Sequence, residues 1–131
     1  MVRINPDGST VDSFNTNLGT GFSSPSPFGQ VLSILVINTG KILVGGTFTT
    51  FNGNARRGLV LLNDDGTEDT SFYTNLGTGF QYSTNPSFVA SISSLNDYTI
   101  TSQILVAGQF DSLNGNTRIG LMRIMDWVPK Y

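Results

Sequence analysis

The sequence predicts an all-β fold built from a tandem repeat, and three observations lead to this prediction. The segment Asn17–Phe22 (Asn-Leu-Gly-Thr-Gly-Phe) returns unchanged as Asn75–Phe80. Runs of apolar and β-branched residues alternate with turns rich in Gly and Asn, and no window of a dozen residues has a helical period. Charged residues make up only 12% of the chain and glycines number 15, a composition typical of short strands joined by turns.

The two copies of the repeat cover almost the whole chain of 131 residues. Residues 1–38 match residues 59–96 at 17 of 38 positions, and residues 41–58 match residues 103–120 at 10 of 18. The strand that begins each copy then returns once more before the chain ends. We therefore expect three parts: repeat 1 at residues 1–58, repeat 2 at residues 59–120, and a third first strand with a C-terminal tail at residues 121–131.

In repeat 1, strands and turns follow one another in a clear order. Val31–Ile37 is apolar and β-branched, Asn38–Gly40 forms a turn and Lys41–Val44 returns, which predicts a hairpin. The pair Gly45-Gly46 follows, and glycines inside a strand indicate a bulge or a close backbone approach. The remaining expected elements are an extended segment at Thr47–Phe51, a tight turn at Asn52-Gly53, a strand at Arg57–Leu62 and a turn at Asn63–Gly66.

Repeat 2 follows the same course with one insertion. Asn96–Gln103 replaces the shorter Asn38–Lys41, and insertions are tolerated at loop tips, so we expect a turn between two strands there. The stretch Asp12–Phe28 and its duplicate Thr70–Phe88 are expected to be ordered loops, because a disordered linker needs no fixed sequence. The matching strands and turn are expected at Val89–Leu95, Ile104–Val106, Asn114-Gly115 and Ile119–Ile124.

The order of motifs resembles a known repeat family. Asn-x-Asp-Gly, Ser-Phe and a Gly-rich stretch are followed by Lys41–Gly53 (Lys-Ile-Leu-Val-Gly-Gly-x-Phe-Thr-x-Phe-Asn-Gly) and then by Arg-x-Gly-Leu-Val-x-Leu-Asn. This order is similar to the delta-60 repeat, a β-propeller repeat found in many bacterial surface proteins and in some phage proteins. The resemblance runs from Met1 to about Ile124 and is strongest over Lys41–Gly66. It implies a fold and no particular activity, because propellers host many unrelated functions.

A propeller needs more blades than two repeats supply, since propellers typically close at about 4–8 blades. An open arc would expose sheet faces and edges that are prone to aggregation. We therefore expect copies of the chain to close the ring, most simply as a homotrimer of six blades, with the last strand of one chain filling the gap at the start of the next. The expected interface residues are Met1, Val2, Ile4, Leu121, Met122, Ile124, Trp127 and Tyr131.

The C-terminal tail departs from the repeat, which has Asn-x-Asp-Gly at the position of Met125. The tail carries Trp127, the only Trp of the chain, and ends at Tyr131. Trp, Tyr and Met are enriched at protein interfaces. Two interpretations stay open: Trp127 caps its own blade, or Trp127 and Tyr131 anchor the tail on a neighbouring subunit or another protein.

The residue types indicate no catalytic, cofactor-binding or metal site. The chain has no His and no Cys, which removes the commonest general base and thiol chemistry. Asn63–Asp69, with Asp64, Asp65 and Asp69, resembles the start of a calcium loop but lacks the closing bidentate Glu, so we expect a plain turn and keep a cation site as the alternative. Gly19–Gly21 and its duplicate lack the Lys-Ser/Thr of a phosphate loop. A glycosidase needs two acids at a set separation, whereas this chain has one Glu and its nine acidic residues fall mostly in turns.

Two sets of recurring residues have a structural interpretation. Arg56 and Arg118 occupy equivalent positions, and we expect them to bond the carbonyls of a neighbouring turn, with ligand binding as the alternative. The Phe pairs 14/72, 22/80 and 48/110 are expected in the core. Aromatic residues without a counterpart are free to serve an interface: Phe28, Tyr73, Tyr82, Phe88, Tyr98, Trp127 and Tyr131.

The function expected from these features is non-enzymatic. A short chain without a signal segment fits a phage virion component (tail, fibre, baseplate or capsid decoration) that assembles with itself and with other virion proteins, and phage appendages are often trimeric. The alternatives are an extracellular or bacterial cell-surface module that binds a glycan, a piece of a larger propeller, and an enzyme. The seven scattered Lys and Arg residues and the net charge of −2 argue against nucleic acid, and no apolar run suggests membrane insertion.

Overall fold

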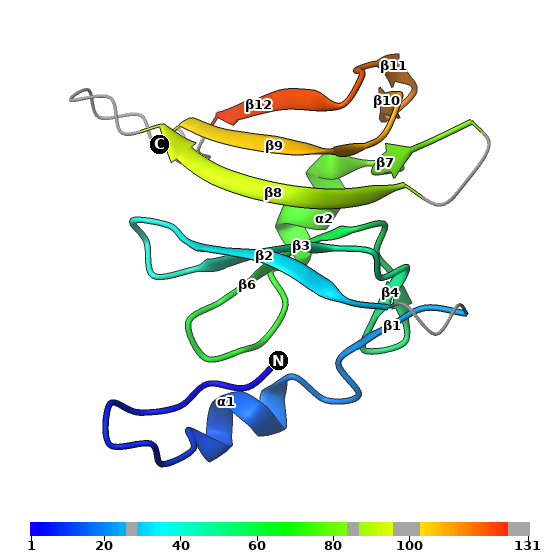
Figure 1. Ribbon diagram of the computed structural model, residues 1–131. Helices are drawn as coiled ribbons and strands as arrows, with labels where there is room; N and C mark the ends of the chain where they lie inside the picture. The colour runs from blue at the N-terminus through cyan, green and yellow to red at the C-terminus, as the bar shows by residue number, and fades with distance from the viewer. Residues whose placement is uncertain (26–28, 84–86, 96–102, 126–131) are drawn as a thin grey trace.

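Two three-stranded antiparallel sheets lie one above the other in the computed structural model shown in Figure 1, which describes residues 1–25, 29–83, 87–95 and 103–125. Each sheet has the hairpin predicted from the sequence, followed by a third strand that pairs with the hairpin's second strand. Blade 1 has the order β2-β3-β6, with β2 at Val31–Val36, β3 at Ile42–Gly46 and β6 at Leu59–Leu62. Blade 2 has the order β8-β9-β12, with β8 at Phe88–Leu95, β9 at Gln103–Gln109 and β12 at Leu121–Met125.

Each blade is accompanied by a small sheet of two-residue strands. One contains β1 (Phe22–Ser23), β4 (Thr50–Phe51) and β5 (Asn54–Ala55), and the other contains β7 (Phe80–Gln81), β10 (Ser112–Leu113) and β11 (Asn116–Thr117). The predicted tight turns join β4 to β5 and β10 to β11. Their Asn residues, Asn52 and Asn114, have φ angles of 48° and 49°, which a tight hairpin turn requires. With these short strands the described residues contain twelve strands.

The predicted irregularity at Gly45-Gly46 is a bulge in blade 1. Val31 lies opposite Gly46 and Ser33 opposite Gly45, so that one extra residue bends β2. A Cβ on Gly46 would lie 2.0 Å from the carbonyl oxygen of Gln30, which no side chain could tolerate. Blade 2 repeats this bulge between β8 and β9.

The expectation of ordered loops at Asp12–Phe28 and Thr70–Phe88 is wrong where each stretch begins. Residues Asp12–Asn17 form α1 and residues Thr70–Leu76 form α2. Both helices span two turns or fewer, and such a helix shows too few apolar residues for a helical period to be visible. The Phe of each helix, Phe14 or Phe72, packs against a blade and supplies the tertiary contact that holds it.

The blades pack face to face, with β8 lying on β2 and β3. We call the face of blade 1 that carries Leu35 and Leu43 its upper face and the opposite face, which carries Ile34 and Val44, its lower face. The lower face of blade 2 carries Ile92 and Val106 and rests on the upper face of blade 1. One core fills this contact, and its buried members are Leu43, Leu59, Leu61, Phe80, Val89, Ile92, Ile104, Val106 and Phe110.

The two helices fill the space beside the third strands. Helix α2 contacts β6 and contributes Phe72 and Leu76 to the core between the blades. Helix α1 covers the β3 and β6 part of the lower face of blade 1. The second core lies beneath it and contains Phe14, Leu18, Val44, Phe48, Phe51, Val60 and Leu62. The prediction of an all-β fold made of propeller-type blades is confirmed, with two short helices added. Four of the six paired Phe residues are buried in the cores (Phe14, Phe48, Phe80 and Phe110), whereas Phe22 and Phe72 are partly buried and pack against them.

Candidate functional site

The contact between the two blades is the best-defined interaction surface of the described chain. Ile92 of β8 is only 7% exposed there, and its backbone N–H donates to Ser33 Oγ on β2 at 3.0 Å. Gly45 lies so close to blade 2 that a Cβ on it would come within 2.6 Å of Val89 Cγ1. Three features therefore define how one blade stacks on another: the buried Ile92 side chain, its hydrogen bond to Ser33, and the lack of a side chain at Gly45.

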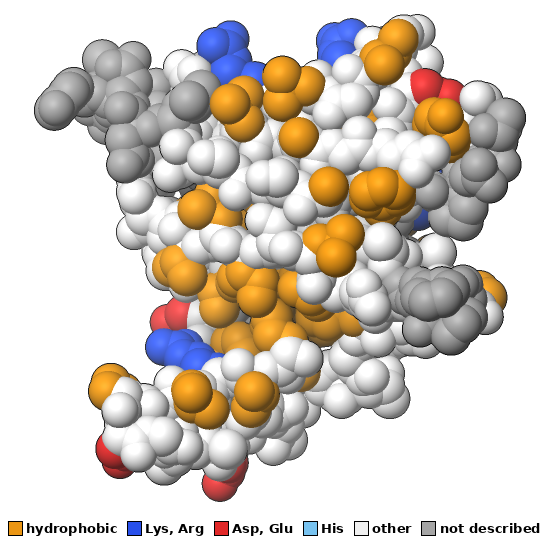
Figure 2. Space-filling model, in the orientation of Figure 1, with side chains coloured by type: hydrophobic (Ala, Val, Ile, Leu, Met, Phe, Trp, Pro, Cys, Tyr) orange, Lys and Arg blue, Asp and Glu red, His pale blue; other side chains and the backbone are white. Residues whose placement is uncertain are grey.

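The lower face of blade 1 carries the same apolar residue without a blade beneath it. Ile34 occupies the repeat position of Ile92, yet it is 50% exposed. Its neighbours Leu32 and Val36 on β2 are exposed as well. Hydrophobic side chains gather in the band between β2 and α1 in Figure 2. This part of the molecule is an apolar surface of the kind that interfaces use.

Among these three side chains, Ile34 is distinguished by the repeat. The equivalents of Leu32 and Val36 in blade 2 are Ala90 and Ser94, and both are exposed beside the blade contact. Ile34 alone has an equivalent that is buried between blades. The comparison therefore identifies Ile34 as the centre of the uncovered stacking surface.

The upper face of blade 2 has some of the residues that the upper face of blade 1 uses to contact blade 2. Ser91 stands at the repeat position of Ser33 and is exposed. Leu121 stands at the position of Leu59, and its exposed fraction is 58% where that of Leu59 is 1%. Three other positions differ: Ser93 replaces Leu35, Arg123 replaces Leu61 and Ala107 replaces Gly45. The upper face of blade 2 is thus more polar and less deeply indented than that of blade 1.

Charged contacts attach α2 to blade 1. Arg56 Nε donates to Glu68 Oε1, Arg56 NH2 donates to Glu68 Oε2 at 3.1 Å, and the guanidinium lies over the Tyr73 ring at 3.6 Å from its centre. Arg56 also donates to the carbonyl of Ala55, the preceding residue in β5. The partners of its side chain are thus Glu68, Tyr73 and this strand carbonyl, and the expected bond to the carbonyls of a neighbouring turn stays a prediction. Tyr73, expected to be free for an interface, is used inside the chain.

Arg118 has the same backbone setting as Arg56 but no such partners within the described ranges. Its NH1 donates to the carbonyl of Thr117 at 2.7 Å, and its backbone N–H donates to the carbonyl of Asp111 at 2.8 Å, as Arg56 N does to Thr49. The side chain is exposed, whereas Arg56 is 8% exposed. Arg118 therefore marks the place where the helix of a following repeat would dock.

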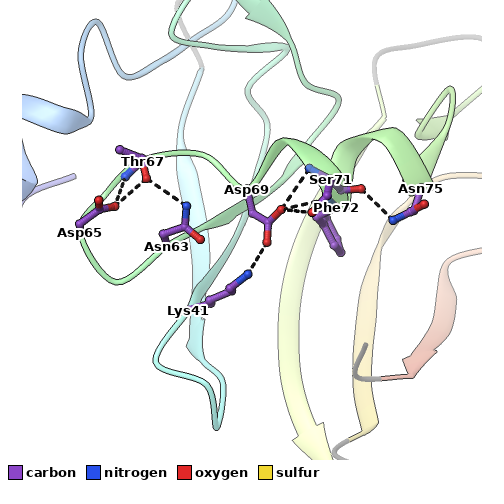
Figure 3. A network of polar contacts seen from close by, with 8 residues as sticks. All are labelled: Lys41, Asn63, Asp65, Thr67, Asp69, Ser71, Phe72 and Asn75. Atoms are coloured by element: carbon purple, nitrogen blue, oxygen red, sulfur yellow. Dashed lines mark hydrogen bonds and ion pairs between the residues drawn. The ribbon is translucent and has the colours of Figure 1, made fainter. Parts of the chain in front are cut away.

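A second ion pair fixes the start of α2, as Figure 3 shows. Asp69 caps the helix by accepting from Ser71 N at 3.1 Å and Phe72 N at 3.2 Å, and it pairs with Lys41 of blade 1. Burial raises the pKa of Asp69, but hydrogen bonds from Lys41, Ser71 and Phe72, together with the Lys41 charge, outweigh burial and lower the pKa from 3.8 to about 2. In α1 the cap position is Val11, which has no capping side chain.

The residues of the supposed calcium loop are engaged in turns. Asp65 Oδ1 accepts from Thr67 N at 2.9 Å and Thr67 Oγ1 at 2.6 Å, and Asp7 makes the same bonds to Ser9 in repeat 1. These bonds lower the pKa of Asp65, the side-chain bond more than the backbone bond. Within the described ranges no three acidic side chains gather in a way that could hold a metal ion. The turn is the interpretation that these contacts favour.

The duplicated Gly-Thr-Gly motif holds a neighbouring hairpin. Asn52 Oδ1 accepts from Thr20 N at 3.2 Å, and Asn114 Oδ1 accepts from Thr78 N at 3.3 Å. A Cβ on Gly19 would lie 2.4 Å from Asn52 Oδ1. The motif recurs because the Asn of each tight turn needs a donor and room for its side chain.

The predicted interface residues fall into three groups. Met1, Val2 and Ile4 are exposed, and Ile4 forms an isolated bridge with Thr10. Leu121, Met122 and Ile124 lie in β12, paired with β9 of their own blade, where Met122 and Ile124 pack against the core. Trp127 and Tyr131, like Phe28 and Tyr98, lie outside the described residues. The interface role of all eight residues stays a prediction.

Sequence reasoning missed Ile34, Ser33 and Ser91 as stacking residues. The signal was present, since Ser33/Ser91 and Ile34/Ile92 are among the few identities that β2 and β8 share. Neither helix in the described part of the chain is long and apolar enough to cross a membrane.

Comparison with known proteins supports the repeat and the fold. A family model described as "Domain of unknown function (DUF5122) beta-propeller" matches residues 38–72 and 102–125. These ranges cover equivalent stretches of the two copies, including β3 and β6 in one and β9 and β12 in the other. Comparison with curated proteins and with solved structures gives no match. The propeller-type repeat is confirmed, while the delta-60 assignment and a phage origin stay predictions.

Proposed function

Because the chain carries β-propeller-type repeats, we propose that it is a non-enzymatic structural module that completes its propeller with copies of itself. Three chains with two blades each give six blades, which is within the usual range for closure. The copies join head to tail, with the lower face of blade 1 resting on the upper face of blade 2 of the next copy. Such a heterologous contact closes into a ring with threefold symmetry.

The observation that carries this proposal is the exposure of Ile34. The same residue type at the same repeat position is 7% exposed at Ile92, where a blade lies beneath, and 50% exposed at Ile34. Burying an Ile side chain stabilises a contact by about 1.5–3 kcal/mol. Docking of a second copy on Ile34 would therefore contribute a free energy of burial similar to the one that Ile92 contributes within the chain.

Two features of the opposite face support a second copy as the occupant. Ser91 can accept a hydrogen bond from Ile34 N–H of the next copy, as Ser33 accepts from Ile92 N–H. Among the described residues the two ends also differ in charge: blade 2 carries Arg118 and Arg123 with one acid, Asp111, whereas the α1 region carries Asp7 and Asp12 with one base, Arg3. Opposite charges on mating faces favour one orientation of docking.

The contact between copies is looser than the contact within one chain. Ala107 stands where Gly45 makes room for Val89, so it would meet Val31 of the next copy. A few tenths of an ångström of extra separation accommodates this methyl group. A ring of three chains then alternates tight internal contacts with looser contacts between chains.

The proposal is tested by a matched pair of variants in size-exclusion chromatography with light scattering. Ile34→Ser should weaken association by about 10–100-fold, as expected for a lost buried Ile. Val36→Ser should leave association unchanged, because its equivalent Ser94 is exposed beside the blade contact. Far-UV circular dichroism checks that both variants fold.

Two outcomes would contradict the proposal. A wild-type chain that stays monomeric and folded at tens of micromolar would refute self-assembly. An Ile34→Ser variant that assembles as well as the wild type would refute the contact assigned to Ile34.

We also propose that this propeller is a component of a phage virion, where it contacts other virion proteins. Its support is the resemblance noted in the sequence and the agreement of a three-chain ring with the threefold symmetry common in phage appendages. Mass spectrometry of particles purified on a density gradient should detect the chain at a constant ratio to the capsid protein. Recovery only in the soluble fraction would contradict this location and leave the self-assembly proposal standing.

A further inference from the structure

Two segments of the chain have the same place in the repeat. Met1–Ile4 and the first four residues of β12, Leu121–Ile124, both correspond to β6 of blade 1. Their sequences are Met-Val-Arg-Ile and Leu-Met-Arg-Ile, with the Arg and the Ile in common. In the described structure β12 pairs with β9, while Met1–Ile4 pairs with no strand of either blade.

Residues Met1–Leu18, which we call the N-terminal hook, hold their shape by internal contacts. Val11 N donates to Arg3 O at 3.0 Å, Asn5 N donates to Ser9 O at 2.8 Å, and Arg3 N donates to Asn15 Oδ1 at 3.0 Å. The Arg3 guanidinium lies 5.5 Å from the centre of the Phe14 ring. The strand and α1 of the hook are therefore joined to each other as one unit.

The corresponding stretch of repeat 2, residues 59–76, has the same two backbone bonds. Asp69 N donates to Leu61 O at 2.8 Å, and Asn63 N donates to Thr67 O at 2.8 Å. This stretch supplies β6 to blade 1 and places α2 against the upper face of the same blade. The N-terminal hook thus has the form of a segment that completes one blade and covers it.

Head-to-tail docking creates a competition for one strand position. If α1 of one copy covers the upper face of blade 2 in the next copy as α2 covers blade 1, the strand of the hook arrives at the edge of β9. That edge holds β12 of the same chain. Keeping β12 in place would require the hook to break its own bonds between Arg3 and the α1 region.

We propose that in the assembled protein Met1–Ile4 of one copy replaces β12 on β9 of the next copy. This inference rests on the proposed self-assembly and specifies its strand exchange. In the register of β12, Arg3 would lie opposite Leu105 and Ile4 opposite Ile104. Val2 and Ile4, both 60% exposed in the single chain, would take the half-buried places of Met122 and Ile124.

The exchange preserves the sheet while the hook keeps its contacts. One strand of four residues leaves β9 and another with nearly the same sequence takes its ladder hydrogen bonds. In a single chain β12 prevails, because it is tethered to β9 and has the higher effective concentration. Inside a ring both strands are held close to β9, so the contacts of α1 decide the outcome.

Disulfide trapping tests the exchange cleanly, because the chain has no cysteine of its own. Leu105→Cys is combined with Arg3→Cys in one variant and with Arg123→Cys in the other; the two Arg residues are equivalent in the repeat. Residues directly opposite on neighbouring antiparallel strands are close enough for a disulfide. Each variant is oxidised in its assembled form and analysed by gel electrophoresis without reductant and by peptide mass spectrometry.

The expected result is a link between chains for the 3/105 pair and little or no link for the 105/123 pair. In the Ile34→Ser background, at a concentration where light scattering shows that variant to be monomeric, the 105/123 pair should close within the chain, which would confirm that the geometry permits the bond. A ring that forms but closes the 105/123 pair within each chain would overturn the strand exchange and leave self-assembly intact. A wild-type chain that never assembles would overturn both.

Discussion

At the scale of single residues, the approach of the two blades is limited at Gly45. A Cβ at this position would lie 2.6 Å from Val89 Cγ1 and 3.0 Å from Ile92 Cδ1. Gly45 is an ordinary strand residue without a positive φ, so space and not backbone conformation excludes a side chain here. The repeat confirms this interpretation, because Ala107 occupies the equivalent position on the upper face of blade 2, where no described blade lies against it.

Gly45→Ala should therefore destabilise the chain by about 1–3 kcal/mol, the usual range for overpacking a core. The measurement is urea unfolding followed by circular dichroism. A double-mutant cycle with Val89→Ala provides the control, since removal of Val89 Cγ1 should relieve most of the effect. Additive losses in the double variant would show that the methyl group does not collide with Val89.

Asp69 gives the chain a pH-dependent contribution to stability. Its pKa is about 2 in the folded chain against an ordinary value of 3.8, so the unfolded chain takes up a proton first as the pH falls. The contribution of Asp69 is complete above about pH 4 and is lost as the pH falls through the folded pKa. Hydrogen bonds also lower the pKa values of Asp7, Asp65 and Asp111, so the stability of the folded chain should likewise fall with pH through these groups.

Asp69→Asn should flatten the acid side of the stability profile. Asn can still cap α2 but cannot pair with Lys41, so the variant should be less stable than the wild type at pH 6 and approach it near pH 2. Thermal unfolding at half-unit pH steps measures this difference. A gap of constant size from pH 6 to pH 2 would argue against an ionised Asp69 in the folded chain.

At the scale of elements, α2 packs against β6 and the core between the blades, and Arg56 attaches it through Tyr73 and the preceding Glu68. Arg56→Ala should cost about 3 kcal/mol, because it leaves the half-buried Glu68 carboxylate without its partner. Arg118→Ala is the matched control and should cost less than about 0.5 kcal/mol, since its exposed side chain has no described carboxylate partner. Both are compared by chemical unfolding in the Ile34→Ser background, which removes assembly from the measurement. Equal losses would contradict the role assigned to Arg56.

The elements that could be predicted are those with a strong local signal. The hairpin of β2 and β3 was evident from two apolar runs around a turn, and the turn at Asn52-Gly53 from its dipeptide. The helices were missed because six or seven residues rich in Ser, Thr and Asn show almost no period. Their caps were the available signals for α2, with Asp69 before it and Gly77 after it. The exposure of Ile34 could not be predicted, because the same residue occupies the same repeat position at Ile92 and only the tertiary structure decides whether a blade lies beneath it.

At the scale of the whole molecule, one face of blade 1 is packed against blade 2, and the other carries the equivalent stacking residue without a described blade against it. The upper face of blade 1 is covered by β8 and α2, whereas the lower face of blade 1 is covered by α1 only in part. The need for further blades stays a prediction that rests on the number of repeats. The side chains of the blade contact could not be predicted, since Ser33, Gly45 and Ile92 come together only through packing.

The unequal faces of the two-blade unit give it a direction, much as a monomer in a polar filament has a plus and a minus end. In the proposed assembly each copy adds only with its lower face to the upper face of another. Growth would then have one polarity, and the angle between successive copies would decide whether it ends in a ring. A copy damaged at Ile34 keeps an intact upper face. Mixed with wild-type chains, such a copy would bind the lower face of a wild-type copy through its intact upper face. Its own damaged lower face would then fail to bind the next copy, so a small fraction of the variant would stop growth.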